Sequence, residues 1–577
     1  MTIAVSIENL SFTYQGQQLP ALRNISARIK KGSSVCVMGH GGAGKSSLCY
    51  SLNALIPKFF RGTYQGRVFI NGKEAARSNV AAMSREVGMV FQDFESQLFS
   101  TNVELEMAFG PENHGLPRPE IEKRVQEMLK AVGLGSLQER QPATLSGGQK
   151  QRLAIGSVLT IKPQILVLDE PTTDLDPQGA EEVLALTGKM RGEGRTLVMV
   201  APEPEMALEA DELWLMQEGE IIRQGPPEQI LTDLSAISAS GIKPPAFIEL
   251  FRALHWTGSP LTLEEALDLI DRQGIVKTAR PPIHFSEDLQ HRAPFLLQAE
   301  GLEYQYPLQE ERALKGIHLG LREGEFVALL GQNGSGKTTL AKHCNGLLYP
   351  GSGRMLVQGK PTTEYRRKDL AREVGYVFQN PDHQIFARTV EEEVGFGLKV
   401  MGLDQKTIRE RMAEALEVVE LEGYEKKLPF TLTKGERQRV AVASVLAVRP
   451  RLIILDEPTT GLDYLHQRRM MNLLRLLNQK GHTIIIITHS MWVAAEYARR
   501  TVVLKDGKII LDGPTRHLFS QEPELAQASL APPPLVQLSN RLGLQSLTLE
   551  EMVKELSHQD RGQGGQIKTP GMTLKNQ

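Results

Sequence analysis

Two glycine-rich segments of this chain each end in a lysine and a hydroxyl residue, a pattern that suits phosphate binding. Residues 39–46 read Gly-His-Gly-Gly-Ala-Gly-Lys-Ser, and residues 331–338 read Gly-Gln-Asn-Gly-Ser-Gly-Lys-Thr. Glycines let backbone N–H groups wrap a phosphate, the lysine neutralises the terminal phosphates, and the hydroxyl is available to Mg²⁺. We call these segments the first and second phosphate loops, and expect each to bind a nucleoside triphosphate.

Each phosphate loop follows a short apolar run, at 34–38 and at 326–330, and precedes a segment of helical composition. A strand, a loop and a helix in this order aim the N-terminus of the helix at an anion. A chance glycine-rich turn is the alternative, but two loops with the same flanks argue against it. The residues predicted to bind nucleotide here are Gly39, Gly41, Gly42, Gly44, Lys45, Ser46, Ser47, Gly331, Asn333, Gly334, Gly336, Lys337, Thr338 and Thr339.

The loops belong to a repeat that covers nearly the whole chain. Val-Phe-Gln at 90–92 returns at 377–379, Leu-Ser-Gly-Gly-Gln at 145–149 returns as Leu-Thr-Lys-Gly-Glu at 432–436, and both copies have an apolar run that ends in Asp-Glu. The offset between copies is 292 at the lysines (337 minus 45) and 287 at the glutamines (379 minus 92). About five extra residues near 57–62 of the first copy explain the difference, and we interpret them as a loop insertion.

Length and patterning predict two large α/β domains in series. At 577 residues the chain exceeds what one hydrophobic core usually organises. In each half, short Val/Ile/Leu runs alternate with helical stretches, which is typical of a mostly parallel sheet covered by helices. Residues 118–132 and 404–421 are expected to be helical. The predicted organisation is a first domain at 1–235 with a tail at 236–271, a linker at 272–294, a second domain at 295–528 with a tail at 529–558, and a disordered end at 559–577.

Composition excludes several classes of function. The formal net charge of -2 provides no basic field for nucleic acid. Cys36, Cys49 and Cys344 have neither paired nor metal-ligand spacing, so a reducing compartment is expected. No apolar run approaches the ~18 residues that span a bilayer. We therefore expect no nucleic acid partner and no direct insertion into a membrane.

Both halves resemble ATP-binding-cassette (ABC) ATPase domains. The resemblance lies in the phosphate loops, the Val-Phe-Gln segments, the Asp-Glu pairs and the segments 145–149 and 432–436, which we call the first and second signature segments. The resemblance implies two P-loop NTPase domains, each with an antiparallel β subdomain and a helical subdomain beside the main sheet. It also implies that ATP and Mg²⁺ bind between the phosphate loop of one domain and the signature segment of the other, here by pairing within one chain. The signature residues predicted to contact ATP are Ser146, Gly147, Gly148, Gln149, Thr433 and Gly435.

The same resemblance assigns roles around the phosphates. Mg²⁺ is expected to be held by Ser46, Gln92 and Asp169 in the first copy and by Thr338, Gln379 and Asp456 in the second. The catalytic residues expected are Glu170, Glu457, Gln92, Gln379 and His489, with the glutamates as general bases for the attacking water. Tyr14 and Tyr306 are expected to stack on adenine, although either is equally compatible with core packing.

The two halves differ at the positions that matter for hydrolysis. Pro202 stands where the first copy should have the equivalent of His489, and proline offers neither a side-chain donor nor a backbone N–H. In the second signature segment, Lys434 replaces a glycine and Glu436 replaces a glutamine. In a head-to-tail pair both changes belong to the same ATP site, the one that contains the first phosphate loop. We hypothesise one hydrolytic site around Lys337 and one slower site around Lys45, with neutral drift as the alternative.

The segments after the glutamines, 91–99 and 378–386, resemble those of ATPases from energy-coupling-factor (ECF) importers of vitamins and transition metals. The resemblance implies a transmembrane scaffold protein and a substrate-binding membrane protein as partners, at the cytoplasmic face of the cell membrane. Leu98, Phe99, Ile385 and Phe386 are candidate contacts for the scaffold, with local core packing as the alternative. Two other classes stay open: a soluble twin-cassette factor that acts on the ribosome, and the ATPase of a sugar importer.

Overall fold

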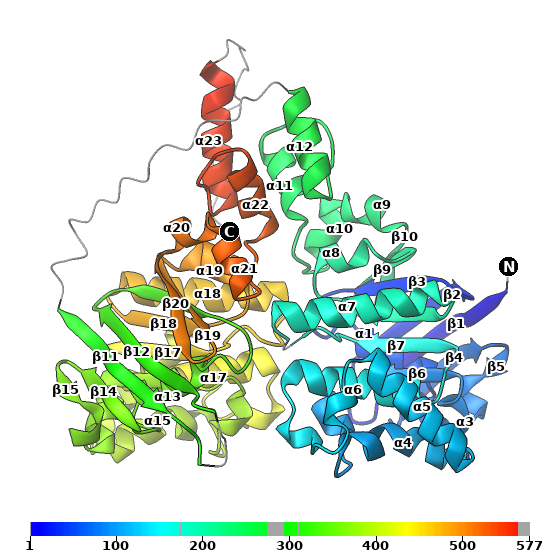
Figure 1. Ribbon diagram of the computed structural model, residues 1–577, viewed down its shortest axis with the longest axis horizontal. Helices are drawn as coiled ribbons and strands as arrows, with labels where there is room; N and C mark the ends of the chain where they lie inside the picture. Colours follow the sequence, from blue (N-terminus) through cyan, green and yellow to red (C-terminus); the bar gives the residue numbers. More distant parts are fainter. Residues whose placement is uncertain (1, 174, 274–293, 308–310, 563–577) are drawn as a thin grey trace.

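The computed structural model describes residues 2–173, 175–273, 294–307 and 311–562. Two halves lie side by side, and helices from both halves meet above them (Figure 1). Each half contains a six-stranded sheet and a separate four-stranded antiparallel sheet, both with helices around them. The α/β class predicted from the sequence is confirmed.

The main sheet of the first half is parallel except for one edge strand, β10. In spatial order its strands are β10 (Glu220–Gly225), β9 (Glu212–Gln217), β3 (Ser34–Met38), β8 (Thr196–Val200), β7 (Ile165–Asp169) and β6 (Val87–Val90). The antiparallel sheet has the order β2 (Leu22–Lys30), β1 (Ile3–Tyr14), β4 (Gly62–Ile70) and β5 (Lys73–Glu74).

The second half repeats this topology strand for strand. Its main sheet has the order β20 (Lys508–Pro514), β19 (Arg500–Lys505), β13 (Phe326–Leu330), β18 (Thr483–Ile487), β17 (Leu452–Asp456) and β16 (Val374–Val377). Its antiparallel sheet has the order β12 (Leu314–Arg322), β11 (Phe295–Tyr304), β14 (Ser352–Val357) and β15 (Lys360–Pro361).

Strand β3 shows why these runs are apolar at every position. Val35 and Val37 pack into a core shared with the antiparallel sheet and α1 (Lys45–Leu52), whereas Cys36 and Met38 pack into a second core on the other side. Parallel strands covered on both faces read as continuous hydrophobic runs. The phosphate loop leaves this buried strand at its carboxyl end, the edge of a parallel sheet where ligands bind.

The helices of the two halves correspond closely. In the first half they are α1, α2 (Leu55–Lys58), α3 (Val80–Met83), α4 (Val103–Asn113), α5 (Arg118–Ala131), α6 (Gly147–Leu159), α7 (Pro177–Gly192), α8 (Pro204–Ala207), α9 (Pro227–Leu231) and α10 (Leu234–Ala239). In the second half they are α13 (Lys337–Cys344), α14 (Arg367–Glu373), α15 (Val390–Val400), α16 (Gln405–Val418), α17 (Lys434–Leu446), α18 (Tyr464–Gln479), α19 (Met491–Tyr497), α20 (Thr515–Phe519) and α21 (Glu522–Gln527). The helices expected at 118–132 and 404–421 are present as α5 and α16.

The first half carries one helix without a counterpart, α2, next to the segment predicted as an insertion. Phe60 follows it and stacks on Tyr50 with ring centroids 5.0 Å apart. Phe59 remains 71% exposed. The extra residues therefore form a short helix and an aromatic contact on α1, and the main sheet is unchanged by them.

The tails of both halves form one bundle. It consists of α11 (Ala246–Ala253), α12 (Leu263–Arg272), α22 (Pro534–Arg541) and α23 (Leu549–Gly562), which meet at the top of Figure 1. Its core contains Phe251 and Leu250 from the first half and Leu538 and Met552 from the second, all fully buried. The two halves are therefore joined by this packed core as well as by the segment of chain that connects them.

Irregular structure was expected in the linker between the halves and at the end of the chain. The expected linker, 272–294, lies mostly outside the described residues, and so does the end of the chain from 563. The segment from 559 was expected to be disordered, but its first residues continue α23 to Gly562. No helix in the described ranges combines the length and apolar content needed to cross a membrane.

Candidate functional site

The two phosphate loops adopt the same conformation. Lys45 Nζ donates to the carbonyl oxygens of Gly39 (2.8 Å) and His40 (3.0 Å), and Lys337 Nζ donates to those of Gly331 (2.8 Å) and Gln332 (2.8 Å). Each ammonium therefore lies across its own loop. Lys337 is 6% exposed, and this burial lowers the pKa of its ammonium. A buried cation beside the N-terminus of a helix suits a polyphosphate.

Glycine is required at the last loop position before each lysine. Gly44 has a φ of 98° and Gly336 a φ of 104°, in the left-handed region. A Cβ on Gly44 would lie 2.4 Å from the carbonyl oxygen of Ala21, and one on Gly336 would lie 2.7 Å from that of Ala313. Gly42 and Gly334 also have positive φ values, of 83° and 81°, but face open space.

The acidic residues that end β7 and β17 lie beside the loops, with different partners. Asp456 Oδ2 accepts hydrogen bonds from Thr338 Oγ1 and Tyr376 OH, each at 2.8 Å. Both carboxylate oxygens of Asp169 are buried and accept no hydrogen bond from the described residues. Burial raises the pKa of Asp169 to about 6, and the nearby Ser46 hydroxyl opposes this rise only in part.

These residues fit a magnesium ion. A buried carboxylate that accepts no well-formed hydrogen bond is costly, and a hard divalent cation would supply a strong interaction at Asp169. Ser46 and Thr338 follow the loop lysines at the start of α1 and α13 and are partly exposed to the same side. Met89 stands where the second half has Tyr376 (376 minus 287), which explains why only Asp456 has a hydroxyl partner from β16.

The two candidate general bases have different neighbours. Glu170 accepts a hydrogen bond from Gln92 Nε2 (2.9 Å) and lies 3.7 Å from Lys45 Nζ. Glu457 Oε2 lies 3.0 Å from His489 Nδ1. The side chain of Gln379 is exposed and makes no hydrogen bond to Glu457 in the described residues. The structure thus brings together Glu457 and His489 in one half, and Glu170 and Gln92 in the other.

Both glutamates have strained backbones. The φ of Glu170 is 49° and that of Glu457 is 48°, in the left-handed region that side chains other than glycine rarely adopt. Such strain is concentrated at functional sites, where the surrounding structure holds it in place. Each glutamate is thereby turned away from its strand and toward the phosphate loop side.

Tyr14 and Tyr306 lie against the helix that follows each loop. Tyr14 OH is 2.9 Å from Ser47 Oγ, and Tyr306 OH is 3.2 Å from Thr339 Oγ1. Tyr14 also packs edge-on against Phe12, with ring centroids 4.9 Å apart. These contacts fix the two rings at matching positions, and adenine stacking stays a prediction.

Two aspartates that sequence reasoning missed connect the halves. Asp463 Oδ2 accepts a hydrogen bond from the backbone N–H of Gly41 (2.8 Å), and Asp176 Oδ2 accepts one from that of Asn333 (3.0 Å). Each aspartate lies seven residues after the aspartate of its own Asp-Glu pair (176 minus 169; 463 minus 456). That repeated spacing was a signal for a shared role. Each phosphate loop therefore contacts the opposite half.

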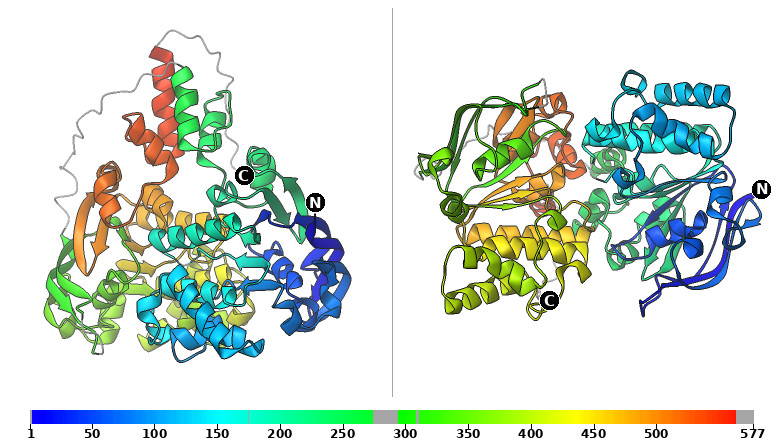
Figure 2. Two further views of the ribbon diagram at one scale, coloured as in Figure 1. Left: turned by 45° about the vertical axis from the view of Figure 1, so that its right-hand side comes forward. Right: turned by 90° about the horizontal axis from the view of Figure 1, so that it is seen from below.

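The first signature segment (145–149) faces the second phosphate loop. A Cβ on Gly147 would lie 3.7 Å from Asn333 Nδ2 of that loop. Ser146 and Thr433 are the N-caps of α6 and α17, each with a capping box that includes Gln149 or Glu436. Gly148 and Gly435 pack against the start of α7 and α18. Seen from below, α4–α6 and α15–α17 lie at diagonally opposite corners, as expected for a head-to-tail pair (Figure 2).

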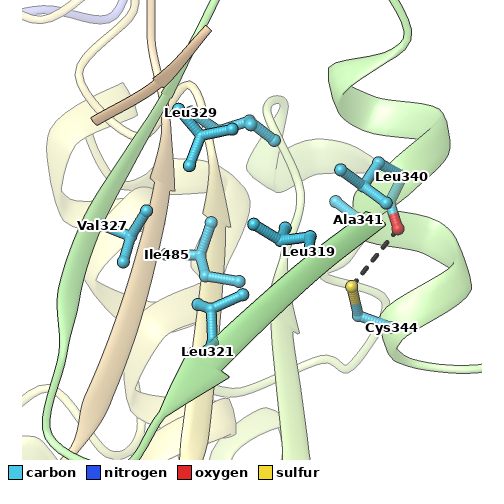
Figure 3. A pocket seen from close by; sticks show the side chains of 9 residues that line it. Leu319, Leu321, Val327, Leu329, Leu340, Ala341, Cys344 and Ile485 are labelled. Atoms are coloured by element: carbon cyan, nitrogen blue, oxygen red, sulfur yellow. Dashed lines mark hydrogen bonds between the residues drawn. The ribbon is translucent and has the colours of Figure 1, made fainter. Parts of the chain in front are cut away.

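The described residues also contain an enclosed apolar pocket, which is a different kind of space. It lies in the second half between β12, β13 and α13, and is lined by aliphatic side chains such as Leu319, Leu329 and Ile485 (Figure 3). Cys344 is the most polar residue there, and its Sγ hydrogen bonds to the carbonyl oxygen of Leu340 (3.3 Å). This pocket offers nothing to a phosphate.

The four candidate scaffold contacts divide into two kinds. Phe99 and Phe386 are 62% and 63% exposed, and each packs edge-on against a second exposed ring, Phe109 or Phe396. Ile385 is only 3% exposed within the core of the second half, so the expectation that it contacts a partner was wrong. Leu98 packs partly buried against the core of the first half. Alternation along an extended segment sends one residue inward and its neighbour outward.

Comparison with known proteins gives consistent matches. The ABC transporter family model matches residues 22–173 and 314–460. An ABC transporter ATP-binding protein of Caldanaerobacter subterraneus is 48% identical over 558 residues, 95% of this chain and 98% of the relative. One from Methanosarcina acetivorans is 43% identical, with coverage of 92% and 89%. A solved structure of cbiO1 from Clostridium perfringens, titled as part of the ABC transporter complex cbiONQ, is 38% identical over 42% of this chain and 98% of its own, with a TM-score of 0.38.

Proposed function

Since this chain belongs to the ABC transporter family of ATP-binding proteins and is an ATPase, we propose that it energises a membrane importer of ECF type. The transported substrate would be a vitamin or a transition metal. Its partners would be a transmembrane scaffold protein and a substrate-binding membrane protein, and its place the cytoplasmic face of the membrane. Closure of the two halves on ATP would move the scaffold, and hydrolysis would reset it.

The observation that carries this proposal is the pair of exposed aromatic contacts at matching positions. Phe99 and Phe386 follow the glutamines by seven residues in both halves (99 minus 92; 386 minus 379). Clustered exposed rings are what a helix of a partner protein would contact. The sequences 91–99 and 378–386 resemble ECF ATPases at this position, which favours that type over a sugar importer.

The residues around the second phosphate loop would together carry out the hydrolysis of ATP. Lys337 and the N–H groups of the second phosphate loop would bind the terminal phosphates, and Ser146 of the opposite half would close over them. Mg²⁺, when bound, would neutralise charge on the phosphates beside Asp456 and Thr338. Glu457 would accept a proton from the attacking water, and His489 would hold Glu457 in place and contact the γ-phosphate.

We further propose that the two composite sites are unequal. At the first, Glu170 has no histidine neighbour because Pro202 occupies that position, and the facing signature segment is the altered one, 432–436. Loss of a contact that strengthens in the transition state slows chemistry more than binding. The site with Lys45 would therefore chiefly hold ATP, and the site with Lys337 would turn over.

The experiment is purification of the tagged full chain from membranes of its native cell in mild detergent, followed by identification of what comes with it. We expect two integral membrane proteins in stoichiometric amounts. The relatives are named as transporter proteins, which already favours this over a ribosome factor. Recovery with ribosomes, or with a substrate-binding protein of the sugar-importer kind, would overturn the proposal in favour of the corresponding alternative.

A further inference from the structure

The hydroxyl groups of the two signature segments have different hydrogen-bond partners. In the first, the N–H of Ser146 donates to Gln149 Oε1 (3.0 Å), and Ser146 Oγ accepts from the N–H of Gln149 (3.3 Å). In the second, Thr433 Oγ1 accepts from the N–H of Glu436 (3.3 Å) and also donates to Glu436 Oε2 (2.9 Å). The first signature segment has no counterpart of this second bond among the described residues.

The bond to Glu436 engages the only proton of the Thr433 hydroxyl. A hydroxyl carries one proton, and an ionised carboxylate accepts but never donates. Toward a phosphate, Thr433 Oγ1 therefore presents lone pairs only. Ser146 Oγ donates to no acceptor among the described residues. Its proton is therefore available to a phosphate of a nucleotide bound at the second phosphate loop.

Glu436 is held in its ionised form by a partner that the first half lacks. Tyr424 OH donates to Glu436 Oε1 (2.9 Å), whereas Leu137 occupies the matching position of the first half (424 minus 287). Burial raises the pKa of Glu436, but the hydrogen bonds from Thr433 and Tyr424 outweigh it, and the pKa is lowered. The carboxylate and its tyrosine thus form a matched pair.

The second difference is a cation. Lys434 stands in place of Gly147, and no carboxylate of the described residues lies within ion-pair distance of it. Its side chain folds over Gly461, where an added Cβ would lie 2.2 Å from Lys434 Nζ. Two residues further on, Asp463 contacts the N–H of Gly41 in the first phosphate loop. The unpaired ammonium therefore lies over the segment that reaches the first nucleotide site.

We propose that the second signature segment holds the terminal phosphate at the first site through Lys434 and not through the Thr433 hydroxyl. This inference rests on the nucleotide pairing proposed above. An ammonium attracts the phosphate through charge, which replaces the lost hydroxyl donor and offsets the nearby carboxylate. Attraction of this kind acts on bound ATP as well as on the transition state, so it favours retention over turnover.

The test is equilibrium binding of labelled ATP and ADP, with Mg²⁺, to the purified full chain. A Lys337→Ala background restricts tight binding to the first site. There, Lys434→Ala should weaken ATP about tenfold or more but ADP less than about threefold, because a charge-assisted contact to the terminal phosphate is lost. Lys434→Arg should keep most of the affinity. Thr433→Val should change it less than about twofold, since that hydroxyl is already engaged.

Matched variants test the hydroxyl directly. In a Lys45→Ala background, Ser146→Ala should weaken ATP binding at the second site several-fold. In the Lys337→Ala background, Glu436→Gln gives the second signature segment the residue that the first one has. Thr433→Val should then become costly at the first site by about the same factor. Ser146→Ala and Thr433→Val each also remove a helix N-cap, so a small loss of stability is expected. Cooperative melting well above the assay temperature would exclude misfolding as the cause.

Three results would overturn the inference: no effect of Lys434→Ala on ATP, equal effects on ATP and ADP, or a Thr433→Val loss as large as that of Lys434→Ala. These outcomes differ from failure of the proposed function. The binding assay uses no membrane partner, and absence of ATP binding in both lysine backgrounds would reject the ATPase itself. Normal binding that ignores Lys434 would reject only the inference.

Discussion

His489 Nδ1 lies 3.0 Å from Glu457 Oε2, and among the described residues this pairing of a histidine with a candidate general base occurs in one half alone. In the other half Pro202 holds the histidine position, and Glu170 is engaged by Gln92 and Lys45 instead. The folds around the two glutamates are otherwise repeated strand for strand. The proposed difference in chemistry would therefore come from a few side chains and not from the fold.

Replacement of the histidine tests this pairing. His489→Ala should lower kcat for ATP hydrolysis about 100-fold, because the glutamate loses its orienting partner and the γ-phosphate loses a donor. ATP binding at equilibrium should change less than about threefold. Pro202→Ala is the matched control and should stay within about twofold of the wild type. If His489→Ala hydrolyses ATP at more than half of the wild-type rate, the role assigned to His489 is wrong.

The cross-half aspartates offer a second test. Asp176 and Asp463 also cap α7 and α18, so serine, which keeps an N-cap, is the appropriate replacement. Asp176→Ser frees the N–H of Asn333 in the site expected to turn over, and should lower kcat about fivefold to tenfold. Asp463→Ser, which acts on the first phosphate loop, should lower it less. Steady-state rates measure both, and a larger loss in Asp463→Ser would contradict the assignment.

The buried carboxylate of Asp169 predicts a pH-dependent stability in the absence of Mg²⁺ and nucleotide. Its pKa is about 6 in the folded protein and 3.8 as the ordinary value, so its ionisation destabilises the fold above about pH 6. This cost disappears as the pH falls from about 6 toward 4. In EDTA, Asp169→Asn should raise the free energy of unfolding by about 1–3 kcal/mol at pH 7.5 and by little at pH 4.

Denaturant unfolding at the two pH values measures this difference. Asp456→Asn is the comparison, because Asp456 already accepts hydrogen bonds from Thr338 and Tyr376 and gains less from neutralisation. With Mg²⁺ and ATP the order should reverse, since Asp169→Asn loses a metal ligand. A variant that is less stable than the wild type in EDTA at pH 7.5 would show that the carboxylate has a partner.

The exposed aromatic residues provide a prediction about partners. Phe99→Glu and Phe386→Glu should each uncouple transport from ATP hydrolysis in the reconstituted importer, because a charge replaces an apolar contact. ATPase activity of the isolated chain should remain intact. Leu19→Glu, at a 72% exposed apolar position in the first half, is the control and should leave transport unchanged. Loss of folding in the phenylalanine variants, or unaffected transport, would reject the contact.

Much of this arrangement could be predicted from the sequence because it is local. Residues 39–46 and 331–338 must form loops between a buried strand and a helix, whatever else the chain does, and the continuous apolar runs before the Asp-Glu pairs require strands covered on both faces. The offset between the halves, 292 at the lysines and 287 from the glutamines onward, then transferred each assignment from one copy to the other. Even the divergence of Pro202 and His489 was visible in this way.

What the sequence did not reveal depends on distances in space. The contact of Asp463 with Gly41 joins residues 422 positions apart and exists only because the halves pair head to tail. The bond from Tyr424 to Glu436 and that from Tyr376 to Asp456 have no counterparts in the first half, so the repeat could not indicate them. The burial of Ile385 beside the exposed Phe386 likewise depends on the local path of the backbone.

The inequality of the two sites is tested most directly by the ATPase rates of Glu170→Gln and Glu457→Gln, measured on the full chain under saturating ATP and Mg²⁺. Glutamine keeps the shape of each side chain but cannot accept the proton from water. We expect Glu457→Gln to lose at least about 100-fold in kcat and Glu170→Gln to remain within about threefold of the wild type. Similar losses in both variants would contradict the division into a site that turns over and a site that holds ATP.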